Sequence, residues 1–461
     1  NEWSMISYLA RATYAYKGKY LLSGAIRADG CSRFGADNRW GYFPSASVGW
    51  RLSEEPFLKN ASSWLDNLKL RASYGMTGNN QIPNYGAIAT LGYDSYVLDG
   101  KKISGMYPQN FADKKLKWEK TGQVNIGFDA SFFNNRLSVT YDYYYSKTKD
   151  LLLDVPIPGI LGFTSSLTNV GQLQNQGMEL QISSRNLVGE FKWNTDFNIS
   201  GNRNKVLKLG QNDAPIQKGN NSCNILIEVG QPLGNYYGYQ LDGVIMSEAE
   251  LTQYPVYDKS EAGDPRVRDV NGPDGKGPDG VVNSYDRTII GNYQPDFTWG
   301  MTNTFMYKNF DLSVMVTGSH GGEIMNQQAR FTKIGRANRG VYKSASNFWK
   351  SEAEPGDGHH YKPRDGETSM QNQCSSYWVE DGSFVRIKNI RLGYTLPNRL
   401  TQKLGITAVK LYLNIENVHV FSDYTNYDPE ASSFQTGIFT GFDYGAYPNP
   451  RVWTMGINFN F

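Results

Sequence analysis

Two neighbouring segments, Val124-Asn-Ile-Gly-Phe-Asp-Ala-Ser-Phe132 and Leu137-Ser-Val-Thr-Tyr-Asp-Tyr-Tyr-Tyr145, decide the fold of this chain. In both, every second residue is apolar and most residues between are small or polar, as in a strand with two different faces. Each segment runs for about ten residues, and a tilted strand needs roughly 9–11 residues to cross a bilayer. Tyr143 and Tyr145 stand where a membrane barrel carries its aromatic girdle. A long hairpin in a soluble β-sandwich shows the same alternation, so the hairpin alone leaves both folds open.

The composition excludes membrane-spanning helices but allows a membrane barrel. No run of about 18 apolar residues occurs in the 461 residues, and the mean hydropathy is −0.53. Barrel strands have one polar face, so this low value is compatible with a barrel. Aromatic residues make up 14% of the chain and glycines number 48, which favours strands and tight turns. The formal net charge of +2 gives no electrostatic support for a nucleic-acid partner.

The three cysteines, Cys31, Cys223 and Cys374, are far apart and odd in number. They have no metal-ligand spacing and form no recognisable disulfide framework. We therefore expect unpaired thiols.

The connections between about thirteen expected strands alternate between short and long. The short ones are at 17–19, 133–136, 186–189 and 308–309, and the long ones are at 30–41, 78–116, 210–295, 320–376 and 422–450. Transmembrane barrels show this asymmetry, with short periplasmic turns and long extracellular loops, whereas a soluble sandwich has no reason to separate its loops by length. The pattern also predicts a small extra hairpin within 78–116, a helical turn within 54–67, a loop at 155–166, and strands at 170–184 and 377–396.

The last strand is the second strong signal. Trp453, Met455, Ile457, Phe459 and Phe461 alternate with polar or small residues up to the end of the chain. Together with the loop pattern, this favours a transmembrane antiparallel β-barrel over a soluble fold.

The other end of the chain opens directly into a strand pattern at Asn1, without a start methionine or an apolar signal core. With an even strand total, an odd number of strands has to precede the first visible one. An open set of strands in lipid leaves unpaired backbone groups that cost several kcal/mol each, as an order of magnitude. We therefore expect an upstream part that closes the sheet.

Several motifs follow one another in a fixed order over nearly the whole chain. They are Leu70-Arg-Ala-Ser-Tyr-Gly-Met-Thr-Gly-Asn79, Leu116-Lys-Trp-Glu-Lys-Thr121, Asn169-Val-Gly171, Asn175-Gln-Gly-Met-Glu-Leu180, Gly230-Gln-Pro-Leu-Gly234, Tyr237-Gly-Tyr239, Ile290-Gly-Asn-Tyr-Gln-Pro-Asp-Phe297, Asp381-Gly-Ser-Phe-Val-Arg-Ile-Lys-Asn389, Leu392-Gly-Tyr-Thr-Leu-Pro397, Asn417, Asp428-Pro-Glu430 and Tyr447-Pro-Asn-Pro-Arg451. Through these motifs the chain resembles the SusC/RagA family of TonB-dependent outer-membrane transporters of Bacteroidota.

The resemblance implies a barrel of about 22 strands, a size that carries a plug in outer-membrane transporters. Residues 1–461 would be its C-terminal barrel portion, with the plug domain, the TonB-binding segment and about nine strands lying upstream. The terminal aromatic Phe461 would be the signal for barrel assembly.

The resemblance also implies partners and a cargo: a SusD-like surface lipoprotein as a lid, the TonB–ExbB–ExbD system acting through the absent N-terminal part, outer-membrane lipid, and a glycan or a peptide. The location would be the outer membrane. The expected function is import of an oligomeric nutrient. The alternatives are a surface or secreted carbohydrate-binding β-sandwich module and a siderophore or cobalamin receptor.

One acidic loop is a candidate calcium site. Carboxylate and amide oxygens spaced among glycines resemble an oxygen-ligand calcium loop, and the candidate ligands are Asp269, Asn271, Asp274, Asp279 and Asp286. The spacing is stretched by extra Gly and Pro residues and no Glu closes the loop, so a solvated turn is the alternative. No other cofactor is expected.

Two further sets of residues are ambiguous. His359 and His360, beside Asp357, suit either a metal or a solvated loop, and no hydrolase-like or nucleotide-binding motif predicts an enzyme. Aromatic residues in loops could stack on sugars, form a partner surface, or pack within the loops; they are Trp40, Tyr93, Tyr96, Tyr236, Tyr237, Trp349 and Tyr444.

Overall fold

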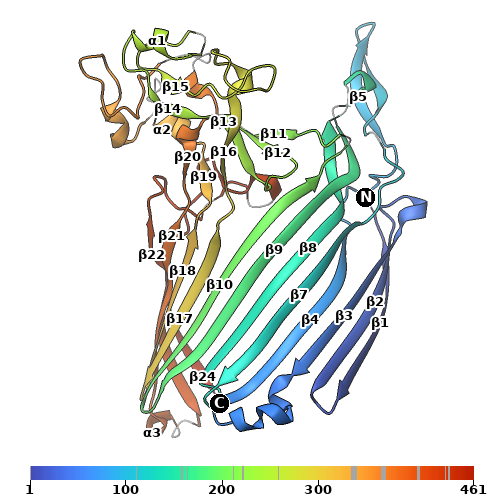
Figure 1. Cartoon of the computed structure of the whole chain (residues 1–461), viewed down its shortest axis with the longest axis vertical. Helices are drawn as coiled ribbons and strands as arrows, with labels where there is room; N and C mark the ends of the chain where they lie inside the picture. Colours follow the sequence, from blue (N-terminus) through green and yellow to red (C-terminus); the bar gives the residue numbers. More distant parts are fainter. Residues whose placement is uncertain are drawn as a thin grey trace. The chain divides into compact units, whose positions relative to one another are not determined.

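The computed structural model of the chain is shown in Figure 1. It describes residues 2–110, 112–156, 159–163, 165–210, 212–220, 223–257, 259–333, 340–364, 370–401, 405–430, 432–434 and 437–460. Phe461, the expected assembly signal, lies outside the described residues.

The chain folds as two compact units. Unit one comprises Asn1–Ile216, Glu228–Pro232 and Met301–Lys308, and unit two comprises Gln217–Ile227, Leu233–Gly300 and Asn309–Phe461. In both units long strands are accompanied by long loops that carry shorter strands.

The regular elements of unit one are mainly strands. They are β1 (Met5–Tyr16), β2 (Tyr20–Cys31), β3 (Trp40–Arg51), β4 (Leu65–Asn79), β5 (Leu91–Leu98), β6 (Lys101–Pro108), β7 (Glu119–Phe132), β8 (Leu137–Pro156), β9 (Ser165–Val188) and β10 (Phe191–Lys208). Among the described residues, four 3₁₀ turns lie between them: η1 (Ala36–Asn38), η2 (Leu52–Glu54), η3 (Pro56–Ala61) and η4 (Gly159–Leu161).

The later elements include both long and short strands. The strands are β11 (Ile216–Asn220), β12 (Cys223–Ile227), β13 (Asn235–Tyr239), β14 (Leu241–Val244), β15 (Pro265–Val267), β16 (Arg287–Asn292), β17 (Phe297–Tyr307), β18 (Phe310–His320), β19 (Glu323–Asn326), β20 (Val379–Asp381), β21 (Phe384–Thr395), β22 (Ala408–Ser422), β23 (Phe442–Asp443) and β24 (Val452–Asn460). The helical turns are α1 (Glu250–Gln253), α2 (Ala329–Thr332), α3 (Asn398–Thr401), η5 (Ser284–Asp286), η6 (Lys343–Asn347), η7 (Met370–Asn372), η8 (Ser376–Trp378) and η10 (Gly437–Phe439).

The main sheet contains thirteen strands in the order β1-β2-β3-β4-β7-β8-β9-β10-β17-β18-β21-β22-β24. This agrees with the number expected from the sequence, and the strands that neighbour each other along the chain pair in antiparallel fashion. The predicted extra hairpin is confirmed as β5 and β6, which pair only with each other among the described strands. In unit two, β11, β12, β13 and β16 form a separate sheet of four strands.

The short turns of unit one are tight because their residues adopt left-handed backbone. Lys17 and Gly18 have φ values of 52° and 65°, the geometry of a hairpin turn that matches strand twist. The turn after β7 uses three successive left-handed residues, Phe133, Asn134 and Asn135. Two of these are asparagines, which pay little for this conformation.

One face of the sheet in unit one carries an exposed apolar row. Strand register places apolar residues opposite one another from β2 to β9: Leu22, Val48, Ala72, Ile126, Tyr143 and Met178. The five larger members are 40–56% exposed, so no second sheet covers them. In unit two the predicted row on β24 is exposed as well, with Met455 at 83%. A soluble sandwich would bury these rows, whereas a membrane barrel turns them to lipid.

Two predicted strands need corrected bounds. The predicted strand 377–396 is divided: Tyr377 and Trp378 are buried in a loop core, Val379–Asp381 forms the short strand β20 of another sheet, and the main-sheet strand β21 begins at Phe384. Strand β9 is longer than the predicted 170–184 at both ends, which also shortens the predicted loop at 155–166. The helical turn expected within 54–67 is confirmed as η3, and a further turn, η2, precedes it.

No helix among the described residues is long and apolar enough to cross a membrane.

Candidate functional site: the polar face and the loop body

The face of unit one opposite the apolar row, here called the polar face, carries a paired charge cluster. Arg71 on β4 donates to Asp129 on β7 at 2.9 and 3.1 Å, and to Asp142 on β8 at 3.0 and 2.9 Å. Lys69 lies 3.9 Å from Asp129. The two cations and two anions therefore neutralise one another in a fixed arrangement.

A glycine makes this cluster possible. Gly127 on β7 lies directly between Arg71 and Asp142 in the strand register. A Cβ at Gly127 would come within 2.4 Å of the Asp142 carboxylate, so a larger residue would block the contact. Gly177 has the same role between Tyr144 and Asn202, whose side chains hydrogen-bond at 2.8 Å across it. Sequence reasoning missed these contacts, although a glycine inside an alternating strand was a usable signal.

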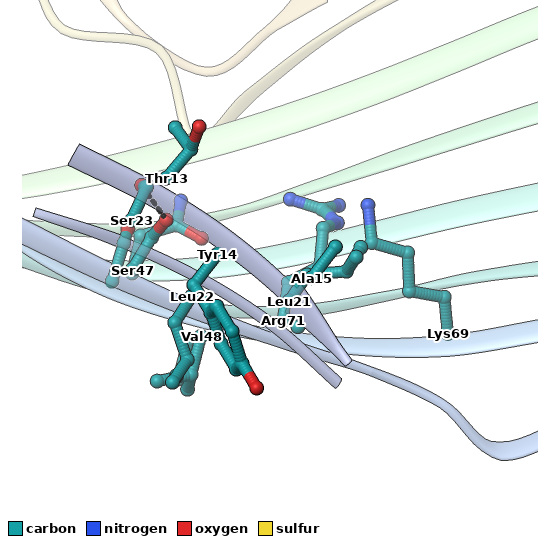
Figure 2. Close-up of a pocket in the computed structure, with 14 residues that line it drawn as sticks. Thr13, Tyr14, Ala15, Leu21, Leu22, Ser23, Ser47, Val48, Lys69 and Arg71 are labelled. Carbon is teal, nitrogen blue, oxygen red and sulfur yellow. Dashed lines mark hydrogen bonds between the residues drawn. The ribbon is translucent and has the colours of Figure 1, made fainter. Parts of the chain in front are cut away.

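Figure 2 shows the two faces at one cavity of unit one, which has a volume of about 460 Å³. Ser23 and Ser47 share a 2.7 Å hydrogen bond and point to the same side as Arg71. Leu22 and Val48 point to the opposite side. The wall is therefore polar on one side and apolar on the other, as the alternation in the sequence predicts.

The loops of unit two pack into a body of their own, here called the loop body. Its core contains Tyr236, Met325, Trp378 and Phe442, all essentially inaccessible to solvent. The Tyr236 hydroxyl donates to the carbonyls of Glu323 and Gly441 at 2.8 and 3.0 Å. Burial raises the pKa of Tyr236 well above its usual value, so the ring is neutral and structural.

A disulfide joins Cys223 and Cys374 inside this core, and the expectation of unpaired thiols is wrong for both. The two residues are 151 positions apart, and the fold brings their Cα atoms to 5.0 Å. Spacing along the chain cannot show such a pairing. Cys31 remains a free, buried thiol.

The five candidate calcium ligands mainly bond to their own loop. Asp286 accepts the backbone N–H groups of Val270, Asn271 and Asn283, and Asp269 accepts those of Asp279 and Gly280. The side chains of the other three candidates, Asn271, Asp274 and Asp279, each accept one backbone N–H as well. Within the described residues, no cluster of three His, Cys, Asp or Glu side chains has a geometry that could hold a metal ion. Calcium binding therefore stays a prediction.

The predicted aromatic residues divide into core and surface. Tyr236 and Trp349 are buried, and the Trp349 indole donates to Met246 at 3.1 Å, so for these two the alternative of loop packing is correct. Tyr237 is partly buried. The remaining four are exposed and available for contact: Trp40, Tyr93, Tyr96 and Tyr444. Tyr93 and Tyr96 lie on opposite faces of the β5–β6 hairpin, so one flat ligand cannot cover both.

The histidine pair is held by Asp357. Its carboxylate accepts the backbone N–H groups of His359 and His360 at 2.9 and 2.8 Å and contacts the His360 ring at 2.7 Å. Burial lowers the pKa of His359, with the neighbouring His360 and Lys333 acting in the same direction.

A partly buried polar junction ties three loops of unit two together. Glu380 accepts hydrogen bonds from Lys333 at 2.6 Å, Asn326 at 2.9 Å and Thr425 at 2.8 Å. Burial by itself would raise the pKa of Glu380, but the Lys333 charge and these bonds lower it below its usual range.

Three of the motifs quoted above meet at a second junction. Arg386 donates to Asp428 at 2.5 Å, and Asp428 accepts two hydrogen bonds from Asn449 at 3.0 and 3.1 Å. Both charged side chains are 3% exposed. The sequence marked these residues only through resemblance; their contact is decided by the fold.

Comparison with known proteins identifies the family. The family described as "TonB dependent receptor-like, beta-barrel" matches residues 4–418. The chain belongs to this family. Because members of the TonB-dependent receptor family are outer-membrane β-barrels, the predicted transmembrane barrel fold and outer-membrane location are confirmed, and the β-sandwich alternative is wrong.

Individual relatives refine the assignment. The chain is 36% identical to "TonB-dependent receptor P3" of Formosa agariphila and 31% identical to "TonB-dependent receptor SusC" of Bacteroides thetaiotaomicron, over 100% and 99% of its length. A solved structure, "Structure of the RagAB peptide transporter", matches 99% of the chain with a TM-score of 0.84 and 26% identity. The resemblance to the SusC/RagA family is thus confirmed.

The chain spans 46% of the first of these relatives, 44% of the second and 47% of the solved chain. The placement of residues 1–461 as the C-terminal barrel portion, with a plug and further strands upstream, stays a prediction.

Proposed function

We propose that the protein containing this chain imports an oligomeric nutrient across the outer membrane in a TonB-dependent way. The observation that carries the proposal is the family match over residues 4–418, on a wall with an exposed apolar row and a polar face. The apolar row would lie against lipid, and the polar face would line the path. The chain would act without catalysis, and no cofactor is required.

The proposal includes a SusD-like lipoprotein as a lid over the long loops and energy from TonB–ExbB–ExbD through an N-terminal part. Support comes from relatives named SusC and RagAB. The cargo would be a glycan or a peptide; the solved relative is named a peptide transporter. The loop body, with its own core and disulfide, would offer a rigid surface to the lid.

The test is uptake by cells. Cells that lack the gene should lose uptake of the cargo, and cells that keep the gene but lack TonB should lose it equally. The lid is tested separately by purifying the full-length protein in detergent: a SusD-like lipoprotein should come with it. Uptake that persists without TonB would refute the transport proposal, and growth rescued only by an iron chelate or cobalamin would favour the receptor alternative.

A further inference from the structure

A second cavity in unit one lies where three loop segments meet. Its described wall residues are Gln81, Pro83, Asn84, Tyr85, Gly86 and Thr90 from the first segment, Gln109 and Asn110 from the second, Gly162, Phe163, Ser165, Ser166 and Leu167 from the third, and Leu152. Its volume is about 830 Å³, within the range of roughly 300–1,000 Å³ that ligand sites occupy. It lies next to the base of the β5–β6 hairpin and at the β8–β9 loop, away from the short turns of the unit.

The lining of this cavity is polar but uncharged. None of the fourteen described residues that line it is Lys, Arg, Asp or Glu. The polar groups are four side-chain amides, three Ser or Thr hydroxyls and the Tyr85 hydroxyl; among the polar residues are Gln81, Asn84, Gln109 and Ser166. An amide offers two donors and one acceptor in one plane, which suits neighbouring hydroxyl groups.

Two of the amides are fixed from behind. Asn110 accepts the backbone N–H and the hydroxyl of Thr90, both at 2.8 Å, and donates to the carbonyl of Ile88 at 3.1 Å. This closes the base of the hairpin. Asn84 accepts from Arg33 at 2.9 Å, which sets the orientation of its amide. The wall is therefore preorganised rather than a loose loop.

An aromatic ring stands at this cavity on strained backbone. Tyr85 has a φ of 64°, in the left-handed region, within a turn closed by Gly86 donating to Pro83 at 3.0 Å. Glycine or asparagine usually occupies this position of the turn, because a bulky side chain is crowded on left-handed backbone. Strain of this kind is concentrated at ligand sites. The tyrosine is 44% exposed, which leaves its ring open to a ligand.

We propose that this cavity binds an uncharged segment of an oligosaccharide, with the Tyr85 ring stacked on a sugar face and the amides bonded to its hydroxyl groups. The uncharged wall argues against sulfated or uronic sugars, since a charge removed from water needs a partner. It also argues against peptide termini for the same reason. The inference rests on the proposed import function and adds to it a site and a ligand class.

The experiment uses the full-length protein in detergent on an array of neutral oligosaccharides, acidic oligosaccharides and tryptic peptides. Wild-type protein should retain neutral oligosaccharides. Tyr85→Asn removes the ring but tolerates left-handed backbone, and it should bind them at least tenfold more weakly. Hydrogen exchange across residues 80–90 should stay equal or become slower. Tyr427→Asn, at a tyrosine that is 75% exposed and does not line the cavity, should stay within twofold of wild type.

The inference is overturned if the array retains only acidic sugars or peptides, if it retains nothing, or if Tyr85→Asn binds within twofold of wild type. If residues 80–90 exchange faster in Tyr85→Asn, Gln109→Ala decides instead: a tenfold loss supports the site and an unchanged affinity overturns it. TonB-dependent uptake of the same array ligands by cells is measured separately. Uptake that continues in Tyr85→Asn cells would remove the site while the import function stands.

Discussion

Replacing Arg386 by methionine should open the loop that ends at Asn449. The side chains of Arg386 and Asp428 are both 3% exposed, so the substitution leaves a carboxylate buried without its cation. Breaking one partner of a buried ion pair costs about 3–5 kcal/mol. Asn449 still donates two hydrogen bonds to Asp428, which places the expected cost near the lower end. Methionine keeps most of the volume, so the effect reports charge rather than packing.

The assay is hydrogen exchange of the peptides around residues 428 and 449, read by mass spectrometry in detergent. A cost of about 3 kcal/mol makes the loop open more often by a factor of over a hundred. The matched control is Lys388→Met, because Lys388 is 39% exposed and lies 3.5 Å from Glu430. An exposed pair of this kind contributes about 0–1 kcal/mol. Equal exchange in the two variants would refute the reasoning. Adding Asp428→Asn to Arg386→Met removes the unpaired charge and should recover part of the lost protection.

Three further predictions concern the core disulfide, the lipid-facing row and the buried Glu380. Cys223→Ser removes a crosslink that spans 151 positions, so the loop body should become sensitive to protease. The chain entropy of the unfolded state sets an upper limit of about 5 kcal/mol on the lost stability. Equal digestion of the wild type and the variant would contradict this. Met455→Lys should destabilise the barrel by about 2–4 kcal/mol, measured by urea unfolding with heat-modifiable gel migration as the readout. Thr454→Lys on the other face should cost much less, and similar losses in the two variants would argue against lipid contact. Because the folded pKa of Glu380 is lowered, its contribution is complete above the usual value of about 4.3 and is lost as pH falls through the folded pKa. The protection of amides near Thr425, measured relative to the intrinsic exchange rate at each pH, should thus fall in acid, and Lys333→Met should flatten that fall.

The candidate sites were less predictable than the strands. For the aromatic residues Tyr236 and Trp349 the sequence left three roles open: stacking on sugars, a partner surface, or packing within the loops. The fold buries both in the core of the loop body. The acidic loop had the residue types of a calcium site, yet the carboxylate oxygens of Asp286 accept hydrogen bonds from backbone N–H groups. Composition predicts which chemistry is available and cannot show where the hydrogen bonds go.

The sequence by itself determined the long strands of the main sheet, their two faces and their approximate number. Alternation along Leu137–Tyr145 and Trp453–Phe459 is a local property, because neighbouring residues of a strand point to opposite sides whatever the strand pairs with. Only the tertiary structure decided which distant residues meet. The Cys223–Cys374 bond, the contact of Arg71 with Asp142 across Gly127, and the pairing of Arg386 with Asp428 all depend on register and loop packing. These arise from contacts between segments far apart in the chain, and no periodicity in one segment encodes its partner.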